Sequence, residues 1–175
     1  MIPVAFEYVA PESLDEAISL LADATSQVGD VQVRNRGTLG GALAHADPAG
    51  DMPSVVTALG GSVIARGPDG EREIPFSEFF QDIFTSALAP VEIVTEVRLV
   101  PQDAGSGVYE KFRRRQIDWA IVGVALNISH SNEVINDVSV VLTNVGPTPV
   151  RASAVEEALS GQSIGPYMTD RKSVV

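Results

Sequence analysis

The chain has 175 residues, 45% apolar and 20% charged, which fits one globular unit or two small lobes with a real core. Its formal net charge is −11, so we do not expect a nucleic-acid partner, because phosphate binding needs a basic surface. The absence of cysteine excludes disulfides, a thiolate nucleophile and iron–sulfur ligands from this polypeptide. The N-terminus lacks the basic and then apolar pattern of a signal peptide, and no apolar run approaches the roughly 20 residues of a membrane span. We therefore expect a cytoplasmic protein.

The opening segment predicts a short strand and one amphipathic helix. Residues 6–9 alternate as a strand does, and Pro11 ends the pattern. Ser13 and Glu16 then form the capping-box pair that begins a helix. Residues 24–30 are small and polar, which predicts a loop. We expect the apolar face of the helix to lie in the core, with Leu14, Ala17, Ile18 and Leu21.

The middle of the chain predicts a short helix and a small antiparallel sheet. Residues 55–59 form an apolar helix that the two following glycines close. Residues 62–65 and 71–74 are strand-like, and the sequence Gly-Pro-Asp-Gly at 67–70 is a hairpin signal. Residues 93–99 alternate cleanly as a half-buried strand. We expect a hydrophobic plug between two layers, formed by Phe76, Phe79, Phe80, Ile83 and Phe84.

The second half of the chain predicts a larger antiparallel sheet. Residues 108–112 extend it, and residues 120–128 and 134–145 form two long strands around the polar turn at 129–133. Residues 153–159 follow as a short helix. Helices and hairpin strands thus occur in separate blocks, which indicates an α+β fold rather than a doubly wound parallel sheet.

The segment from Val31 to Pro53 is the first candidate for binding, because it has the pattern of neither an ordinary strand nor an ordinary helix. Glycine lets a ligand approach the backbone closely, and the two glycines after Thr38-Leu39 expose N–H groups of the kind that hold a phosphate. The apolar residues from Ser54 onward begin a helix, whose N-terminus favours an anion. A turn without a ligand is the alternative, because the glycine spacing matches neither a P-loop nor a dinucleotide-binding fingerprint.

The two histidines, His45 and His130, do not indicate a metal site, because no His, Asp and Glu spacing matches a zinc centre. His45 lies two residues before Asp47. Such a pair can serve acid–base chemistry, or it can be a chance neighbour in an exposed loop. No nucleophile elbow is present.

The second candidate segment runs from Tyr109 to Val124 and reads YEKFRRRQIDWAIVGV. Three arginines precede Asp118 and the only tryptophan, and an apolar strand follows. One interpretation is a solvated basic turn at the edge of a strand. The other is a strand end that presents Lys111, Arg114 and Trp119 to a flat, anionic cofactor. In that case the cations balance negative charge and the indole covers an aromatic ring.

Taken together, these segments resemble the medium, flavoprotein subunits of molybdenum hydroxylases, a family that includes carbon monoxide dehydrogenase and xanthine dehydrogenase types. The second FAD-binding segment of that family is similar to the run GDVQVRNRGTLGGALAHADPAGDMPSVVTALG. Further segments of the family are similar, in the same order, to FEYVAPESLDEAISLLAD, YEKFRRRQIDWAIVGVA and LTNVGPTPVRA. The resemblance extends to about Gln162.

The resemblance implies an FAD site with two parts, of which the first is the glycine-rich segment. Thr38, Leu39, Gly40 and Gly41 match the family's Thr-Ile-Gly-Gly turn, whose backbone lies against FAD. Ala42 replaces the Asn or Ser often found next, so we expect one side-chain hydrogen bond to be missing. Asp51 matches an acidic position that binds the polar part of the cofactor.

The second part implied by the resemblance lies near the isoalloxazine ring. Ile93 matches an aliphatic residue that packs on the flavin region, and Lys111 and Trp119 match a lysine and a ring-covering residue. The implied chemistry is electron relay: FAD takes electrons from a molybdopterin large subunit through the iron–sulfur centres of a small subunit. The redox chemistry then belongs to the cofactor, and the protein supplies position and electrostatics.

The chain departs from the family pattern after its opening helix. There the family has a strand and a loop of the type Ala-Gly-Gly-x-Ser-Leu-Leu-Pro that wraps the FAD pyrophosphate, whereas residues 22–27 here continue directly into residues 28–30. We expect weakened FAD binding, because each lost charge-assisted hydrogen bond is worth roughly 1.5–3 kcal/mol. The opening helix is also expected to lack the sheet that it normally covers.

The expected architecture is α+β, with a remnant of an FAD-binding (PCMH-type) α/β lobe followed by a C-terminal antiparallel sheet with a flanking helix. The expected domains are a truncated FAD-binding domain at 1–105, a C-terminal flavoprotein-subunit domain at 106–165 and a tail at 166–175. The expected function is electron relay through FAD. The alternatives are a cofactor-free structural or assembly module that keeps the partner-docking surface, and a domain that binds another nucleotide.

Overall fold

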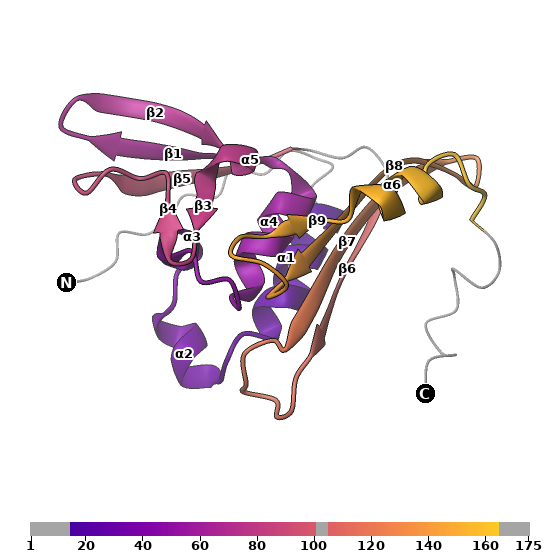
Figure 1. Cartoon of the computed structure of the whole chain (residues 1–175), viewed down its shortest axis with the longest axis horizontal. Coiled ribbons are helices and arrows are strands. Elements are labelled where there is room, and N and C mark those ends of the chain that lie inside the picture. Colours follow the sequence, from indigo (N-terminus) through magenta and orange to yellow (C-terminus); the bar gives the residue numbers. More distant parts are fainter. Residues whose placement is uncertain (1–14, 101–104, 165–175) are drawn as a thin grey trace.

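The structure is a computed structural model, and it describes residues 15–100 and 105–164. These residues form the mixture of helices and antiparallel sheets that the sequence predicts (Figure 1). The helices are α1 (Asp15–Ser26), α2 (Val31–Arg36), α3 (Leu39–His45), α4 (Asp51–Leu59), α5 (Phe76–Phe79) and α6 (Ser153–Leu159). The strands are β1 (Gly61–Gly67), β2 (Gly70–Pro75), β3 (Phe80–Asp82), β4 (Thr85–Ser86), β5 (Ile93–Leu99), β6 (Gly105–Phe112), β7 (Val122–Ser131), β8 (Val134–Thr143) and β9 (Val150–Arg151).

The small sheet has the strand order β2-β1-β5, and all its pairs are antiparallel. The predicted hairpin is confirmed, since β1 and β2 pair down to Gly67 opposite Gly70. The predicted strand at 93–99 is confirmed as β5. A two-stranded ribbon of β3 and β4 lies beside α3 (Figure 1).

The large sheet has the order β6-β7-β8-β9 and contains the long strands predicted for the second half. β7 begins two residues later than predicted and continues through Ser131, because only Asn132 and Glu133 form the turn to β8. β6 begins at Gly105, earlier than the predicted 108. The helix predicted at 153–159 is confirmed as α6.

The predicted helix on one face of the large sheet is α6, and two further helices, α1 and α4, cover the other face. α1 and α4 lie between the large and the small sheet, while α6 packs on β8 from the other side (Figure 1). The main core joins side chains from α1, α4, both sheets and α5, including Leu20, Val55, Val63, Phe79 and Val141. A smaller core under α6 contains Ile135, Val138 and Val140.

The opening helix is longer than predicted, and its predicted core residue Leu21 packs against the main core, while the side chains of Leu14, Ala17 and Ile18 lie outside those described. α1 continues to Ser26 instead of ending before residue 24, and among residues 20–26, whose side chains the structure describes, Leu20 and Ala24 are fully buried. α1 packs on β6 of the large sheet, and the expectation that it lacks the sheet it normally covers stays a prediction. A Cβ on Gly107 would lie 2.8 Å from Leu20 Cβ, so helix and strand approach closely at a glycine.

Only some residues of the predicted hydrophobic plug are buried. Phe76 and Phe79 are buried in the main core, and Phe80 packs against it. Ile83 and Phe84 are 55% and 57% exposed, because they lie at the turn between β3 and β4 rather than between layers.

The glycine-rich segment is helical, which corrects the prediction of a turn. Asp30 caps α2 by accepting a hydrogen bond from Val33 N, and Thr38 caps α3 by accepting one from Gly41 N. α4 also begins earlier than predicted, at Asp51. Pro53 fits in its first turn, where backbone N–H groups have no intrahelical acceptor.

The predicted strand at 6–9 and the tail at 166–175 lie outside the described residues. Among the helices that the structure does describe, none has the length and apolar character needed to cross a membrane.

Candidate functional site

The first part of the predicted site is the N-terminus of α3. Thr38 Oγ1 lies 3.0 Å from Gly41 N, and Thr38 O accepts a hydrogen bond from Ala42 N at 3.0 Å. The N–H groups of Leu39 and Gly40 belong to the first turn and therefore have no intrahelical acceptor. Thr38 and Gly41 are exposed, so this end of the helix is open to a ligand.

α3 lies against the small sheet at Gly40. A Cβ on Gly40 would lie 3.4 Å from Val94 Cγ1 of β5, and a Cβ on Gly41 would lie 2.8 Å from Thr38 Oγ1. Ile93, the residue before Val94, is 64% exposed at the start of β5. The structure thus brings the predicted residues 38–42 and the start of β5 to the same region.

Two further predicted residues, Asp51 and Lys111, have buried side chains that pair with each other. Lys111 Nζ lies 2.8 Å from Asp51 Oδ2, and the two side chains are only 2% and 4% exposed. Tyr109 donates a hydrogen bond from its hydroxyl to Asp51 Oδ1 at 2.6 Å. The two carboxylate oxygens of Asp51 therefore already have partners within the protein, one on each side.

The ends of α1 and β6 are joined to the same network through Gln27. Its carbonyl accepts hydrogen bonds from Lys111 Nζ at 3.3 Å and from Arg113 Nη1 at 3.2 Å. Its side-chain Nε2 donates to Tyr109 O at 3.0 Å. We refer to Gln27, Asp51, Tyr109, Lys111 and Arg113 as the clasp, because they connect α1 and α4 to β6.

Tyr109 acts in the clasp as a hydrogen-bond donor. Burial is the main cause that raises the pKa of its phenol far above the ordinary value, and the charge of Asp51 raises it further. The hydroxyl therefore keeps its proton throughout the pH range in which proteins are handled. Gly123 of β7 makes room for it, since a Cβ there would lie 2.5 Å from the Tyr109 oxygen.

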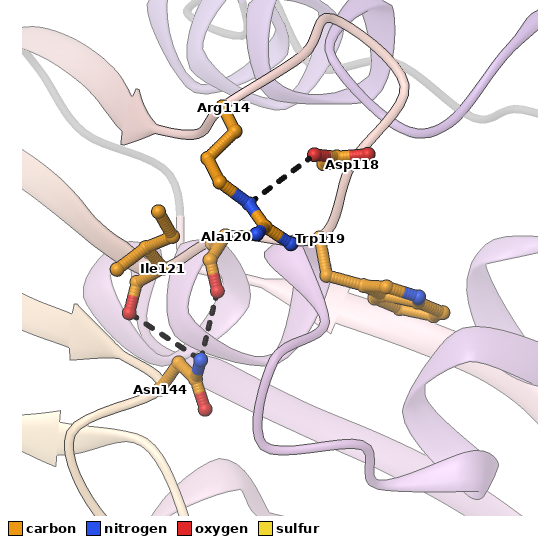
Figure 2. Close-up of a pocket in the computed structure, with 6 residues that line it drawn as sticks. All are labelled: Arg114, Asp118, Trp119, Ala120, Ile121 and Asn144. Atoms are coloured by element: carbon orange, nitrogen blue, oxygen red, sulfur yellow. Dashed lines mark hydrogen bonds and ion pairs between the residues drawn. The ribbon is translucent and has the colours of Figure 1, made fainter.

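Trp119 lies in the connection between β6 and β7, beside a pocket of about 390 Å³. The indole is 63% exposed and points away from the Arg114–Asp118 pair (Figure 2). Asn144 closes the other side, where its Nδ2 donates to Ala120 O at 2.8 Å (Figure 2). The pocket is lined by Arg114, Asp118, Trp119, Ala120, Ile121 and Asn144.

The acid–base pair considered for His45 and Asp47 has no support in this geometry. The His45 ring packs on Phe84 with centroids 5.0 Å apart, and Asp47 Oδ1 accepts a hydrogen bond from Ala49 N within its own loop. No cluster of three or more potential metal ligands occurs among the described residues.

The predicted site residues therefore fall into an open group and a buried group. Residues 38–42, Ile93 and Trp119 lie at or near the surface, whereas Asp51 and Lys111 pair with each other inside the protein. Their roles toward a cofactor stay predictions. Tyr109 was not foreseen as a site residue, and the only local signal was a polar-tipped aromatic side chain in a predicted strand.

Two protein-family models match this chain. Residues 4–102 match the FAD-binding domain in molybdopterin dehydrogenase, and residues 107–171 match the CO dehydrogenase flavoprotein C-terminal domain. The chain belongs to this family of FAD-binding subunits. The predicted resemblance to carbon monoxide and xanthine dehydrogenase flavoproteins is thereby confirmed.

Individual relatives support the same assignment. The chain is 38% identical over 147 residues to the glyceraldehyde dehydrogenase medium chain of Sulfolobus acidocaldarius, covering 84% of this chain and 52% of that one. It is 35% identical to the carbon monoxide dehydrogenase medium chain of Hydrogenophaga pseudoflava, covering 83% and 51%. The solved carbon monoxide dehydrogenase from that organism superimposes with a TM-score of 0.82 and 34% identity, over 90% of this chain and 55% of that one. The chain thus spans about half the length of these relatives.

Proposed function

We propose that this chain is the FAD-binding medium subunit of a molybdenum-hydroxylase-type dehydrogenase and relays electrons through FAD. The observation that carries the proposal is the match of residues 4–102 to the FAD-binding domain in molybdopterin dehydrogenase, and the exposed residues Thr38 and Gly41 lie within that match. Backbone N–H groups at a helix start suit the negatively charged part of such a cofactor.

The open residues of the site fit FAD in their chemistry. Thr38, Leu39, Gly40, Gly41 and Ala42 would offer backbone close to the surface, with no large side chain on the glycines. Trp119 would offer an exposed indole face to the flavin ring, and Ile93 an exposed apolar contact. Bound FAD would supply the redox chemistry, while these side chains hold and orient it.

The partners belong to the same proposal. The relatives are named as medium chains or subunits, which supports a complex of several polypeptides. We propose an iron–sulfur small subunit and a molybdopterin large subunit as partners, since this chain has no cysteine to ligate a cluster itself. The substrate would be set by the molybdenum-containing partner.

A visible absorption spectrum of the purified protein, before and after incubation with FAD and desalting, tests the proposal. We expect a flavin band that is retained after desalting. Trp119→Ala should weaken FAD binding by about 0.5–1.5 kcal/mol through loss of the ring contact. Val155→Ala removes an apolar side chain of α6 that is 47% exposed and serves as the control.

A folded protein that stays colourless at high FAD concentration would contradict the proposal. That result would mean that FAD binding requires the family's phosphate loop, which this chain is expected to lack. Binding of an iron–sulfur partner without flavin would instead favour the assembly module.

A further inference from the structure

We infer that Asp51 and Lys111 are positioning residues: their buried ion pair fixes the β6–β7 connection, which carries Trp119, against the helices that carry Thr38 and Gly41. The inference rests on the proposed function for its purpose, because it concerns the two parts of the proposed FAD site. It assigns the two residues a different role from the direct cofactor contact that the resemblance implies.

The first step of the argument is the state of the two charges. Side chains that are 2% and 4% exposed are cut off from solvent, and a buried charge is stable only with a partner and further hydrogen bonds. Asp51 has Tyr109 and Lys111, and Lys111 also has the carbonyl of Gln27. The two opposite charges cancel, so the pair as a unit adds no net charge toward an anionic cofactor.

The second step is where the pair lies along the chain. Lys111 is the penultimate residue of β6, and Arg113, the first residue after the strand, donates to the same Gln27 carbonyl. Asp51 is the first residue of α4, which follows α3 after a short loop. The ion pair therefore joins the start of the β6–β7 connection, which carries Trp119, to α4. This helix follows α3, which carries Gly41 and is capped by Thr38.

The third step is a second set of hydrogen bonds, made by Asn144 at the end of the β6–β7 connection that leads into β7. Asn144 Nδ2 donates to the carbonyls of Ala120 and Ile121, directly after Trp119. The backbone N of Asn144 donates to Pro48 O at 3.0 Å, in the loop between α3 and α4. Both ends of the Trp119 connection are thus bound to the α3–α4 region, one through the clasp and one through Asn144.

Trp119 is the only tryptophan in the chain, so its fluorescence reports on this connection without any flavin. The test compares the full-length wild-type protein with Lys111→Met and with the double variant Asp51→Asn/Lys111→Met. The readouts are the thermal unfolding midpoint, quenching of Trp119 by the neutral quencher acrylamide, and FAD affinity. Arg115→Met is the control, since it removes a charge from an exposed side chain of the same connection.

We expect Lys111→Met to lower the unfolding midpoint, to raise the acrylamide quenching constant and to raise the FAD dissociation constant about tenfold. The double variant leaves no unpaired buried charge, so its unfolding midpoint should recover in part. The quenching constant of Trp119 and the FAD dissociation constant should stay raised, because the Asp51–Lys111 ion pair is still missing. A purely structural pair would instead show recovery of all three readouts, which overturns the inference.

Two further outcomes also decide the question. Loss of FAD affinity in folded Lys111→Met with unchanged quenching indicates a direct cofactor contact and overturns the inference. If the wild-type protein binds no FAD, the proposed function fails, but the quenching comparison still tests the tie. If both variants fail to fold, Asp51→Asn takes their place, because it removes the ion pair with little change of shape, and wild-type quenching in that variant overturns the inference.

Discussion

At the scale of single residues, Tyr109 is where the buried contacts of the clasp meet. Its side chain is 1% exposed, its hydroxyl donates to Asp51, and its carbonyl accepts from Gln27. Thr143 Oγ1 lies 3.4 Å from the same hydroxyl. A phenol held in this way has one orientation, so any side chain that enters its space must displace it.

Gly123→Ala tests that requirement. The new Cβ would lie 2.5 Å from the Tyr109 oxygen and 3.0 Å from Thr143 Cβ, so we expect a loss of about 1–3 kcal/mol in the free energy of unfolding. Denaturant unfolding measures the change. Gly40→Ala is the control, because its Cβ would lie 3.4 Å from Val94 in ordinary contact, and α3 should be no less stable. Equal stabilities of wild type and Gly123→Ala would show that Tyr109 is free to move.

At the scale of elements, the β7–β8 hairpin has a turn whose second residue does not suit its conformation. Its two turn residues, Asn132 and Glu133, both have positive φ, at 51° and 61°. Two-residue hairpins prefer Asn-Gly in such a turn, because glycine adopts positive φ without a steric cost. Glu133 is therefore a strained position in the longest strand pair of the large sheet.

We expect Glu133→Gly to stabilise the protein by about 1 kcal/mol, since it relieves a left-handed conformation. Thermal unfolding followed by circular dichroism measures the shift of the midpoint. Glu157→Gly, at an exposed position inside α6, makes the same chemical change in a helix and should destabilise by about 1 kcal/mol. A lower midpoint for Glu133→Gly would contradict the strain argument.

A second element-scale prediction concerns the ion pair that ties β2 to the start of β5. Arg72 Nε lies 2.7 Å from Glu92 Oε1, and Ala89 N donates to Glu92 Oε2. These bonds, the Arg72 bond first, lower the pKa of Glu92 from 4.5 to about 2. Because the folded pKa is the lower one, the stabilisation is present above pH 4.5 and is lost as the pH falls toward 2.

Glu92→Gln should therefore lose less stability than wild type between pH 5 and about pH 2. Unfolding midpoints measured across that window provide the check. Glu71→Gln is the matched control, because the Arg66–Glu71 pair is exposed and its atoms are 3.6 Å apart. Parallel pH curves for wild type and Glu92→Gln would refute the assignment.

The elements that the sequence predicted best are those with a local cause. The hairpin at 67–70 follows from its turn residues, and the strand at 93–99 follows from strict alternation. α2 and α3 were missed because they are short and contain or adjoin glycine, so their propensity is weak. Their only local signals are the caps Asp30 and Thr38.

At the scale of the whole molecule, one core unites residues from both expected domains. Leu20 and Val55 from the first share a cluster with Tyr109 and Val141 from the second. The proposed boundary near residue 105 thus divides the sequence but not the packing. The resemblance supplied the candidate site residues, whose roles stay predictions, but the burial of Asp51 with Lys111 could not be predicted, because it depends on how distant segments meet.

The clasp also has a consequence for the order of folding. Its hydrogen bonds join residues that are 58 to 86 positions apart, whereas the β7–β8 hairpin closes over two residues. Contacts across such long segments require the chain entropy of a large loop to be lost first, so local hairpins precede them. If the clasp closes after the folding transition state, weakening it accelerates unfolding and leaves the folding rate almost unchanged. The lifetime of the native chain, rather than its speed of formation, then depends on these five residues.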